Sequence, residues 1–276
     1  MRAKLKFAIG ILTLGTIIAS CSSTKNLKEG ESLYVKGNVI IDSDTISKEN
    51  KEKLATYLQS ALMPKPNKRL AGVPFKLYFN NMAGDSANKN MIKRFFKKIG
   101  EEPVLLSDVN REYNENLLRN RMENIGFFNA EVKSDTLVEE KKATVNYTAK
   151  PNIIYKIQSV KFDIDSNSQL GRDIRSSSDK SLLQVGKHYS LDVVLNERDR
   201  IDNDLKNKGY YYFSPDYILV EVDSSHRNNR VDMYVTVKRK HQHKQRFLRK
   251  SIRSIFSELH GDQFRLPTVD PKCRVV

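Results

Sequence analysis

The sequence predicts an α+β protein built from small tandem modules, each a mixed sheet with two helices on one face. Two observations support this prediction. Two segments of the 276-residue chain repeat the same pattern at a constant offset. Within each segment, the spacing of apolar residues changes from the period of a helix to that of a strand. The predicted order of elements in a module is therefore strand, helix, helix, strand, strand.

Each repeat contains a helix that begins near a serine and ends at a glycine. Ser107 and Ser190 are 83 residues apart, and so are Gly126 and Gly209. A serine hydroxyl satisfies an unpaired backbone N–H at a helix start, and glycine readily adopts the left-handed conformation that ends a helix. Aromatic residues follow each glycine. The residues that define the modules are Gly126, Phe127, Phe128, Gly209, Tyr210 and Tyr211.

After each glycine, apolar and polar residues alternate, which predicts strands with one buried face. The alternation covers residues 143–149 in the first repeat and residues 231–237 in the second. A further strand precedes each of these, at 130–132 and 217–222, and a short turn joins each pair into a hairpin. Residues 160–164 supply the opening strand of the second repeat.

The residues before the first repeat show a weaker form of the same pattern. The sequence predicts a strand at 33–41, a helix after the N-cap Ser47, and an alternating strand at 73–79. A short helix at 91–99 is predicted to carry a solvated basic face. The expected organisation is a degenerate first module at 33–85, a second module at 86–152, a third at 153–237 and a basic tail at 238–276.

The amino terminus has the composition of a secretory signal peptide. Basic residues precede an uncharged run from Phe7 to Ala19, which is shorter than the roughly 20 apolar residues that span a bilayer. The run ends in Ile18-Ala19-Ser20-Cys21, which resembles a bacterial lipobox. The resemblance implies cleavage between Ser20 and Cys21, lipid attachment at Cys21 and a polar tether at 21–32. No Asp follows the cysteine, which by the same resemblance favours the outer membrane. An ordinary signal peptide with a chance cysteine is the alternative.

The lipobox, the repeat and the element order together resemble the POTRA region of the outer-membrane protein assembly family, the BamA/TamA-like proteins. The likeness is greatest to their lipid-anchored, TamL-like version, and residues 65–68, 75–81 and 99–105 are similar to the stretches that open such lipoproteins. The resemblance implies modules that face the periplasm and precede a barrel of about sixteen strands. Because 39 residues follow Val237, we expect a truncated form without the barrel.

The edge strands of such a small sheet can pair with an extended peptide through their backbone groups. We therefore expect a scaffold that binds unfolded outer-membrane proteins or an assembly partner by strand addition. Cover of these edges by a neighbouring module is the alternative. The expected binding residues are Ala130, Glu131, Val132, Lys133 and Ser134 in one repeat, and Tyr217, Ile218, Leu219, Val220, Glu221 and Val222 in the other.

The sequence contains no motif that indicates catalysis or a cofactor. It has no nucleophile elbow, P-loop or dinucleotide fingerprint, and Cys21 and Cys273 are too few for a cysteine zinc site. We expect neither an enzyme nor a metal, cofactor or small-molecule ligand. The aromatic run Tyr210–Phe213 lies beside lysines and could stack nucleic-acid bases. Its match to Phe127 and Phe128 instead favours packing on the sheet, and export argues against a nucleic-acid partner.

The charge of the chain is concentrated in its tail. The chain holds 48 Lys and Arg residues against 33 Asp and Glu residues, a net charge of +15. Residues 238–276 alone hold eleven basic residues against three acidic ones. The apolar spacing from Leu248 to Leu259 predicts a basic amphipathic helix, which could bind an anionic membrane or nucleic acid. A shifted reading frame that replaced the barrel is the favoured interpretation, because the composition changes abruptly after residue 237.

Overall fold

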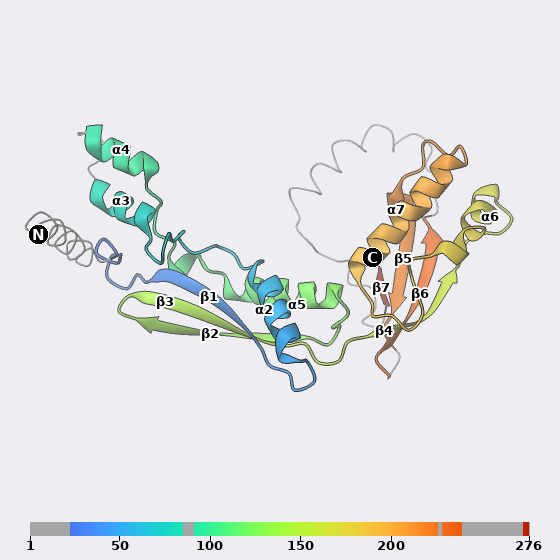
Figure 1. Cartoon of the computed structure of the whole chain (residues 1–276), viewed down its shortest axis with the longest axis horizontal. Coiled ribbons are helices and arrows are strands. Elements are labelled where there is room, and N and C mark those ends of the chain that lie inside the picture. The colour runs from blue at the N-terminus through green and yellow to red at the C-terminus, as the bar shows by residue number, and fades with distance from the viewer. Residues whose placement is uncertain (1–22, 85–90, 226–227, 239–272, 276) are drawn as a thin grey trace, which may run out of the picture. The chain divides into compact units, whose positions relative to one another are not determined.

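A computed structural model describes residues 23–84, 91–225, 228–238 and 273–275. The chain forms two compact units. Unit 1 contains the residues up to 121 together with 131–150, and unit 2 contains 122–130 together with the residues from 151 onward. Each unit holds one small sheet and the helices that cover it (Figure 1), which confirms the predicted α+β class. The predicted cleavage and lipid sites at Ser20 and Cys21 and the predicted tail helix lie outside the described residues.

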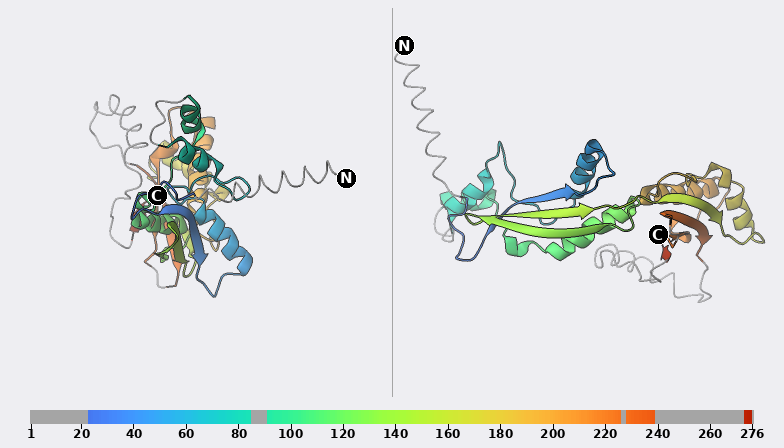
Figure 2. Two further views of the ribbon diagram at one scale, coloured as in Figure 1. Left: turned by 90° about the vertical axis from the view of Figure 1, so that its left-hand side faces the viewer. Right: turned by 90° about the horizontal axis from the view of Figure 1, so that it is seen from below.

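Unit 1 has a three-stranded mixed sheet in the order β1-β3-β2. The central strand β3 pairs in parallel with β1 and antiparallel with β2, and the three strands run side by side in Figure 2. The elements along the chain are β1 (Leu33–Ile41), α2 (Lys48–Gln59), α3 (Phe75–Ala83), α4 (Met91–Ile99), the 3-10 turn η2 (Leu106–Asp108), α5 (Arg111–Asn124), β2 (Glu131–Glu139) and β3 (Lys142–Lys150). The last three residues of α5 fall in unit 2.

The alternation of strand β3 decides which face of this sheet is buried. Its buried residues are Ala143, Val145, Tyr147 and Ala149. Helices α2 and α5 cover this face, and the amide of Asn114 on α5 donates a hydrogen bond to the Tyr147 hydroxyl at 2.9 Å. Tyr34 on β1 is buried in the same core, where burial, with a smaller contribution from Tyr147, raises the pKa of its hydroxyl to about 12.

Unit 2 repeats the topology of unit 1. Strand β4 pairs in parallel with β6, and β5 pairs antiparallel with β6, in the order β4-β6-β5-β7. Its elements are β4 (Lys156–Phe162), α6 (Gln169–Arg175), η3 (Ser178–Lys180), α7 (Leu191–Asn207), η4 (Pro215–Tyr217), β5 (Ile218–Asp223), β6 (Arg230–Val237) and β7 (Cys273–Val275). Apolar residues of α6, α7 and the sheet form one core, which includes Ile174, Val194, Ile201, Leu205, Val220 and Met233.

The two glycines of the repeat have the expected left-handed conformation, with φ of 96° at Gly126 and 95° at Gly209. The predicted serine caps differ from the structure. Ser107 lies in the turn η2, and α5 is instead capped by Asn110, whose side chain accepts the N–H of Tyr113 at 2.9 Å. Ser190 does occupy the N-cap position of α7, but its side chain makes no capping hydrogen bond.

The predicted strand at 73–79 is wrong, because this segment forms helix α3. The predicted separation of a first module at 33–85 also differs from the structure, since β1 lies in one sheet with β2 and β3. The described residues therefore contain two sheets rather than three. In unit 1 the β-α-α-β-β order is kept by β1, α2, α5, β2 and β3, and helices α3 and α4 are an insertion between α2 and α5.

Candidate functional site: the edge of strand β2

Strand β2 is an outer strand of its sheet, and the predicted binding segment from Ala130 to Ser134 lies at its beginning. On one side, β2 pairs with β3 from Glu131↔Lys150 to Glu139↔Lys142. Within the described parts of the chain, no strand pairs with the other side of β2. The structure therefore contains a nine-residue sheet edge, whose first four residues fall within the predicted segment.

The register shows which backbone groups of β2 point away from the sheet. A two-residue turn, Glu140 and Lys141, joins β2 to β3, and both turn residues have positive φ. Glu139 and Lys142 therefore form a hydrogen-bonded pair, and the pattern alternates along an antiparallel ladder. The odd-numbered residues of β2 direct their backbone N–H and C=O groups toward β3. The even-numbered residues direct their N–H and C=O groups outward; these are Val132, Ser134, Thr136 and Val138.

Part of the predicted segment is not free to bind a peptide. The N–H of Ser134 donates to the Glu115 carboxylate at 2.8 Å, and the Ser134 hydroxyl donates to the same oxygen. Glu115 lies on α5, so a helix side chain covers the middle of the edge. At the beginning of the segment, the N–H of Ala130 donates to the carbonyl of Phe127. The contact with Glu115 depends on the tertiary structure, and nothing in the local sequence around residues 130–134 indicates it.

The open part of the edge lies closer to the hairpin turn. Among the described residues, no group accepts a hydrogen bond from the backbone N–H of Thr136 or Val138. The side chains of Leu137 and Val138 are about half exposed, at 52% and 48%. An extended peptide that pairs with Thr136 and Val138 would therefore contact apolar side chains as well as backbone groups.

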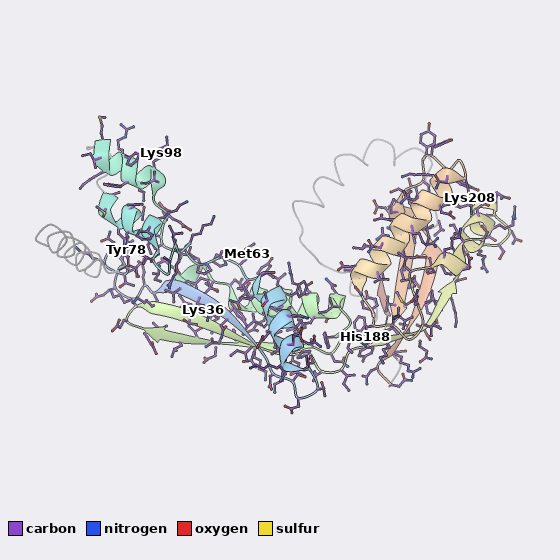
Figure 3. The ribbon with its side chains drawn as sticks, in the orientation of Figure 1. Lys36, Met63, Tyr78, Lys98, His188 and Lys208 are labelled. Atoms are coloured by element: carbon purple, nitrogen blue, oxygen red, sulfur yellow. The ribbon has the colours of Figure 1, made fainter. Side chains whose placement is uncertain are left out.

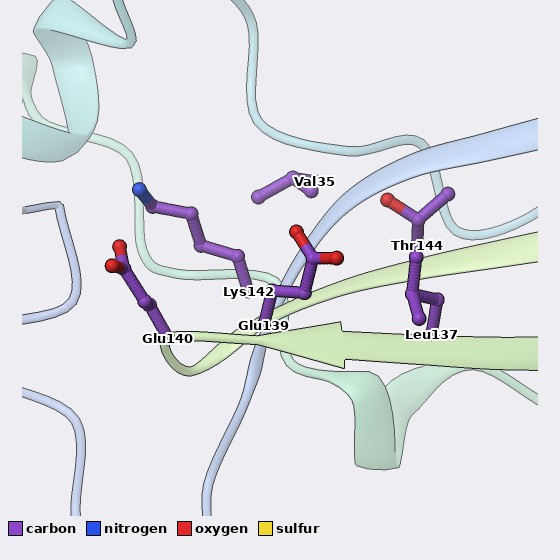
Figure 4. Close-up of a pocket in the computed structure, with 6 residues that line it drawn as sticks. All are labelled: Val35, Leu137, Glu139, Glu140, Lys142 and Thr144. Carbon is purple, nitrogen blue, oxygen red and sulfur yellow. The ribbon is translucent and has the colours of Figure 1, made fainter.

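A surface depression of about 530 Å³ lies at the same end of the sheet, beside the turn between β2 and β3 (Figure 4). Its walls carry an apolar side chain from each outer strand together with charged groups beside the turn. The residues that line it are Val35, Leu137, Glu139, Glu140, Lys142 and Thr144. Because Leu137 belongs to both the edge strand and the depression, side chains of an added strand would reach the depression.

The second predicted edge, Tyr217–Val222, is partly occupied by the chain itself. Ile218 to Asp223 form β5, and Tyr217 lies in the turn η4. Strand β7 pairs antiparallel with β5, with Glu221 opposite Val275 and Asp223 opposite Cys273. This edge therefore accepts an antiparallel strand, and a segment near the end of the chain already fills the position.

The aromatic residues after the two glycines differ in their exposure. Phe127 and Phe128 are buried, and the Phe128 ring packs edge-on against Tyr155 with ring centroids 5.1 Å apart. In the second repeat, Tyr211 is 77% exposed. Tyr210 packs partly against the core of unit 2, as does its near neighbour Phe213, and Tyr212 is 97% exposed.

The Tyr210 hydroxyl is held by a polar contact rather than by the apolar core. It donates a hydrogen bond to the Asp173 carboxylate at 2.6 Å. This hydrogen bond is the largest cause of a lowered pKa at Asp173, followed by one from Gln169. The contact joins α6 to the turn after α7, so Tyr210 fixes the end of the long helix in unit 2.

Neither a metal cluster nor a membrane-spanning helix is found in the described residues. The described residues contain no group of three or more His, Cys, Asp or Glu side chains that could hold a metal ion. Across the part of the chain that the structure describes, no helix combines the length and the apolar character needed to cross a membrane.

Comparison with known proteins gives structural neighbours at low identity. No protein-family model matches the chain, and no curated protein matches it. The chain is similar to POTRA domains 3–5 of BamA from Haemophilus influenzae, at 12% identity over 78% of this chain and 100% of that chain, with a TM-score of 0.30. It is also similar to POTRA domains 1–2 of Omp85 from Anabaena, at 12% identity over 77% and 99% of the two chains, with a TM-score of 0.34.

Proposed function

We propose that the protein is a periplasmic scaffold of outer-membrane protein assembly that binds extended polypeptide segments along β2. The observation that carries the proposal is the outward backbone of Thr136 and Val138, whose N–H groups have no hydrogen-bond acceptor among the described residues. Its ligands would be unfolded outer-membrane proteins or an assembly partner. Pairing through the backbone is nearly independent of the ligand sequence, which suits a scaffold that meets many different clients.

The two units differ in how they would serve this function. The β2 edge of unit 1 is open beside the hairpin turn, whereas the β5 edge of unit 2 carries β7. We therefore assign binding of the extended peptide to unit 1. The alternating side chains of the ligand would contact Leu137 and the depression beside it. The charged residues Glu139, Glu140 and Lys142 at its wall would favour ligands with complementary polar groups.

A proline substitution tests this binding mode directly. Proline removes a backbone donor and is tolerated on the outer side of an edge strand. We expect Thr136→Pro to weaken binding of an unfolded β-barrel strand peptide about tenfold, the effect of losing roughly 1.4 kcal/mol. The matched control Thr136→Ala keeps the N–H and should bind like the wild-type protein. Fluorescence anisotropy of a labelled peptide measures both, and equal affinities for the two variants would refute the proposal.

We further propose that lipids on Cys21 anchor the scaffold to the outer membrane. The lipobox-like segment Ile18-Ala19-Ser20-Cys21 supports this proposal. Attachment of two or more acyl chains is sufficient for stable anchoring. Incorporation of labelled palmitate into the wild-type protein should be lost in Cys21→Ala, and the variant should leave the outer-membrane fraction. Retained label in the variant would exclude Cys21 as the attachment site.

The alternative function places binding in the basic tail, on an anionic membrane or a nucleic acid. The observation that favours it is the excess of basic residues in 238–276, of which most lie outside the described residues. Two results together would favour this alternative. Thr136→Pro would leave the binding of a β-barrel peptide unchanged, and neutralising the tail lysines would abolish binding of anionic vesicles or nucleic acid.

A further inference from the structure

Helices α3 and α4 form a packed hairpin within unit 1. The rings of Phe79 on α3 and Phe96 on α4 stack with their centroids 5.7 Å apart. Lys97 donates a hydrogen bond to the side chain of Asn80 at 3.0 Å. At Gly100, just after α4, an added Cβ would lie 2.7 Å from the backbone nitrogen of Asn80, so the two segments approach too closely for a larger residue. The hairpin is therefore a defined structural element.

Helix α4 is strongly amphipathic, and its apolar side is largely exposed. Three large apolar side chains are exposed on it: Met91 at 84%, Ile92 at 65% and Phe95 at 59%. Met82 near the end of α3 is also exposed, at 56%. Residues at positions i, i+1 and i+4 lie on one side of a helix, so Met91, Ile92 and Phe95 form one apolar surface.

The opposite side of α4 is basic. Its four charged residues are Lys93, Arg94, Lys97 and Lys98, and the helix contains no acidic residue. Figure 3 labels Lys98 on α4 and Tyr78 on the neighbouring α3. A helix with exposed large apolar residues on one side and four cations on the other matches the surface of an anionic membrane, where the apolar side enters the acyl boundary and the cations contact the headgroups.

The amino-terminal segment holds this hairpin close to the residue proposed to carry lipid. The amide of Asn81 on α3 donates to the carbonyl of Ser23 at 3.3 Å, and the amide of Asn26 donates to the carbonyl of Asn81 at 3.0 Å. Leu27 is buried beside Leu77 of α3. The segment expected as a polar tether is thus packed on α3. Ser23 is two residues from Cys21, a separation that the chain can span over at most about 7 Å.

We propose that the α3–α4 hairpin is a membrane-docking element that inserts Met91, Ile92 and Phe95 into an anionic phospholipid surface. We infer a lipid surface as the partner from the charge of α4 and from the contacts of α3 with Ser23 and Asn26. The inference deepens the proposed function, because it also depends on the lipid site at Cys21 for its placement in the cell. Docking would hold unit 1 against the membrane into which its clients are inserted.

A site-specific probe tests the contact separately from lipid attachment. The full chain with Cys21→Ala and Cys273→Ala carries an environment-sensitive fluorophore at Met91→Cys, and a matched protein carries it at Tyr212→Cys, a residue that is 97% exposed in unit 2. The proteins are mixed with phosphatidylcholine vesicles that either contain or lack phosphatidylglycerol. Because this protein has no lipid attached, its behaviour does not depend on whether Cys21 is modified in the cell.

The proposal predicts that the emission of the Met91→Cys probe rises roughly twofold and shifts to shorter wavelength with anionic vesicles alone. The Tyr212→Cys probe should not respond. Adding Arg94→Glu and Lys98→Glu should reduce the apparent affinity for anionic vesicles, measured at the Met91→Cys probe, by more than about tenfold. The reason is that each basic residue near the membrane contributes electrostatic attraction to the anionic headgroups. An unresponsive Met91→Cys probe, whether or not the protein sediments with the vesicles, overturns the proposal, as does an equal response at both positions.

Discussion

Glu115 controls how much of the β2 edge a ligand can use. Its carboxylate accepts the outward N–H of Ser134, so a peptide that extends along the whole strand must displace it. A hydrogen bond to a charged group is stronger than one to a neutral carbonyl, and its loss has to be offset by the new contacts. The native edge is therefore open at Thr136 and Val138 and blocked at Ser134. In the proposed binding mode, Glu115 limits strand addition at Ser134, and its hydrogen bond removes one free N–H from the edge.

Removal of the Glu115 carboxylate should strengthen binding of a β-barrel strand peptide. We expect Glu115→Ala to bind about fivefold more tightly, corresponding to roughly 1 kcal/mol of competition relieved. Glu115→Gln is the matched control, because its amide oxygen still accepts the Ser134 N–H, and its affinity should fall between those of the wild type and Glu115→Ala. Isothermal titration with one peptide measures all three proteins. Unchanged or weaker binding by Glu115→Ala would show that Ser134 takes no part in recognition.

Residue types were sufficient to predict the glycine helix ends, but not the helix cap at Asn110 or the contact of Glu115 with the sheet edge. Gly126 and Gly209 were predictable because a left-handed helix end favours glycine whatever surrounds it. The N-cap Asn110 was missed, although asparagine is a favoured cap, because Ser107 three residues earlier fits the same rule. Glu115 could not be found from sequence, since its partner Ser134 is 19 residues away and becomes a neighbour only after α5 packs on the sheet.

At the scale of elements, periodicity succeeded where a strand had one clear solvent face. Strand β3 buries alternate residues as its sequence predicts. In β6 the predicted residues Val231, Met233 and Val235 are buried, but Asp232 between them is buried as well. Helix α3 shows the limit of this approach, because Val73, Phe75, Leu77 and Phe79 alternate over too short a run to distinguish strand from helix. In the structure Leu77 is fully buried and Phe79 stacks on Phe96 of α4, so the partner helix decides the conformation.

Pairing between distant elements was the other feature that sequence patterns could not reveal. Strand β1 lies beside β3, with Val39 opposite Tyr147, although more than a hundred residues separate them. The α3–α4 insertion lies between these strands in the chain and made residues 33–85 resemble a separate module. A corresponding bridge in each unit supports the corrected topology: Leu33 pairs with Leu105, and Lys156 pairs with His188, again with an offset of 83 residues between the later partners.

At the scale of the whole molecule, one topology is used twice with different accessibility. Unit 1 keeps an open edge at β2 and carries the basic α3–α4 hairpin, whereas the corresponding edge of unit 2 is paired with β7. The net charge of +15 belongs partly to the tail and partly to local groups such as the four cations of α4. In the proposed function, unit 1 holds both the binding site for clients and the surface that meets the membrane.

Amide hydrogen exchange on β2 distinguishes strand addition from other modes of peptide binding, because strand addition forms backbone hydrogen bonds at defined positions. With a saturating unfolded β-barrel strand peptide, exchange at the outward amides of Thr136 and Val138 should slow roughly tenfold or more. The amide of Leu137 already faces β3 and should change little. A peptide that binds without protecting Thr136 and Val138 would contradict strand addition at this edge and with it the proposed mode of client binding.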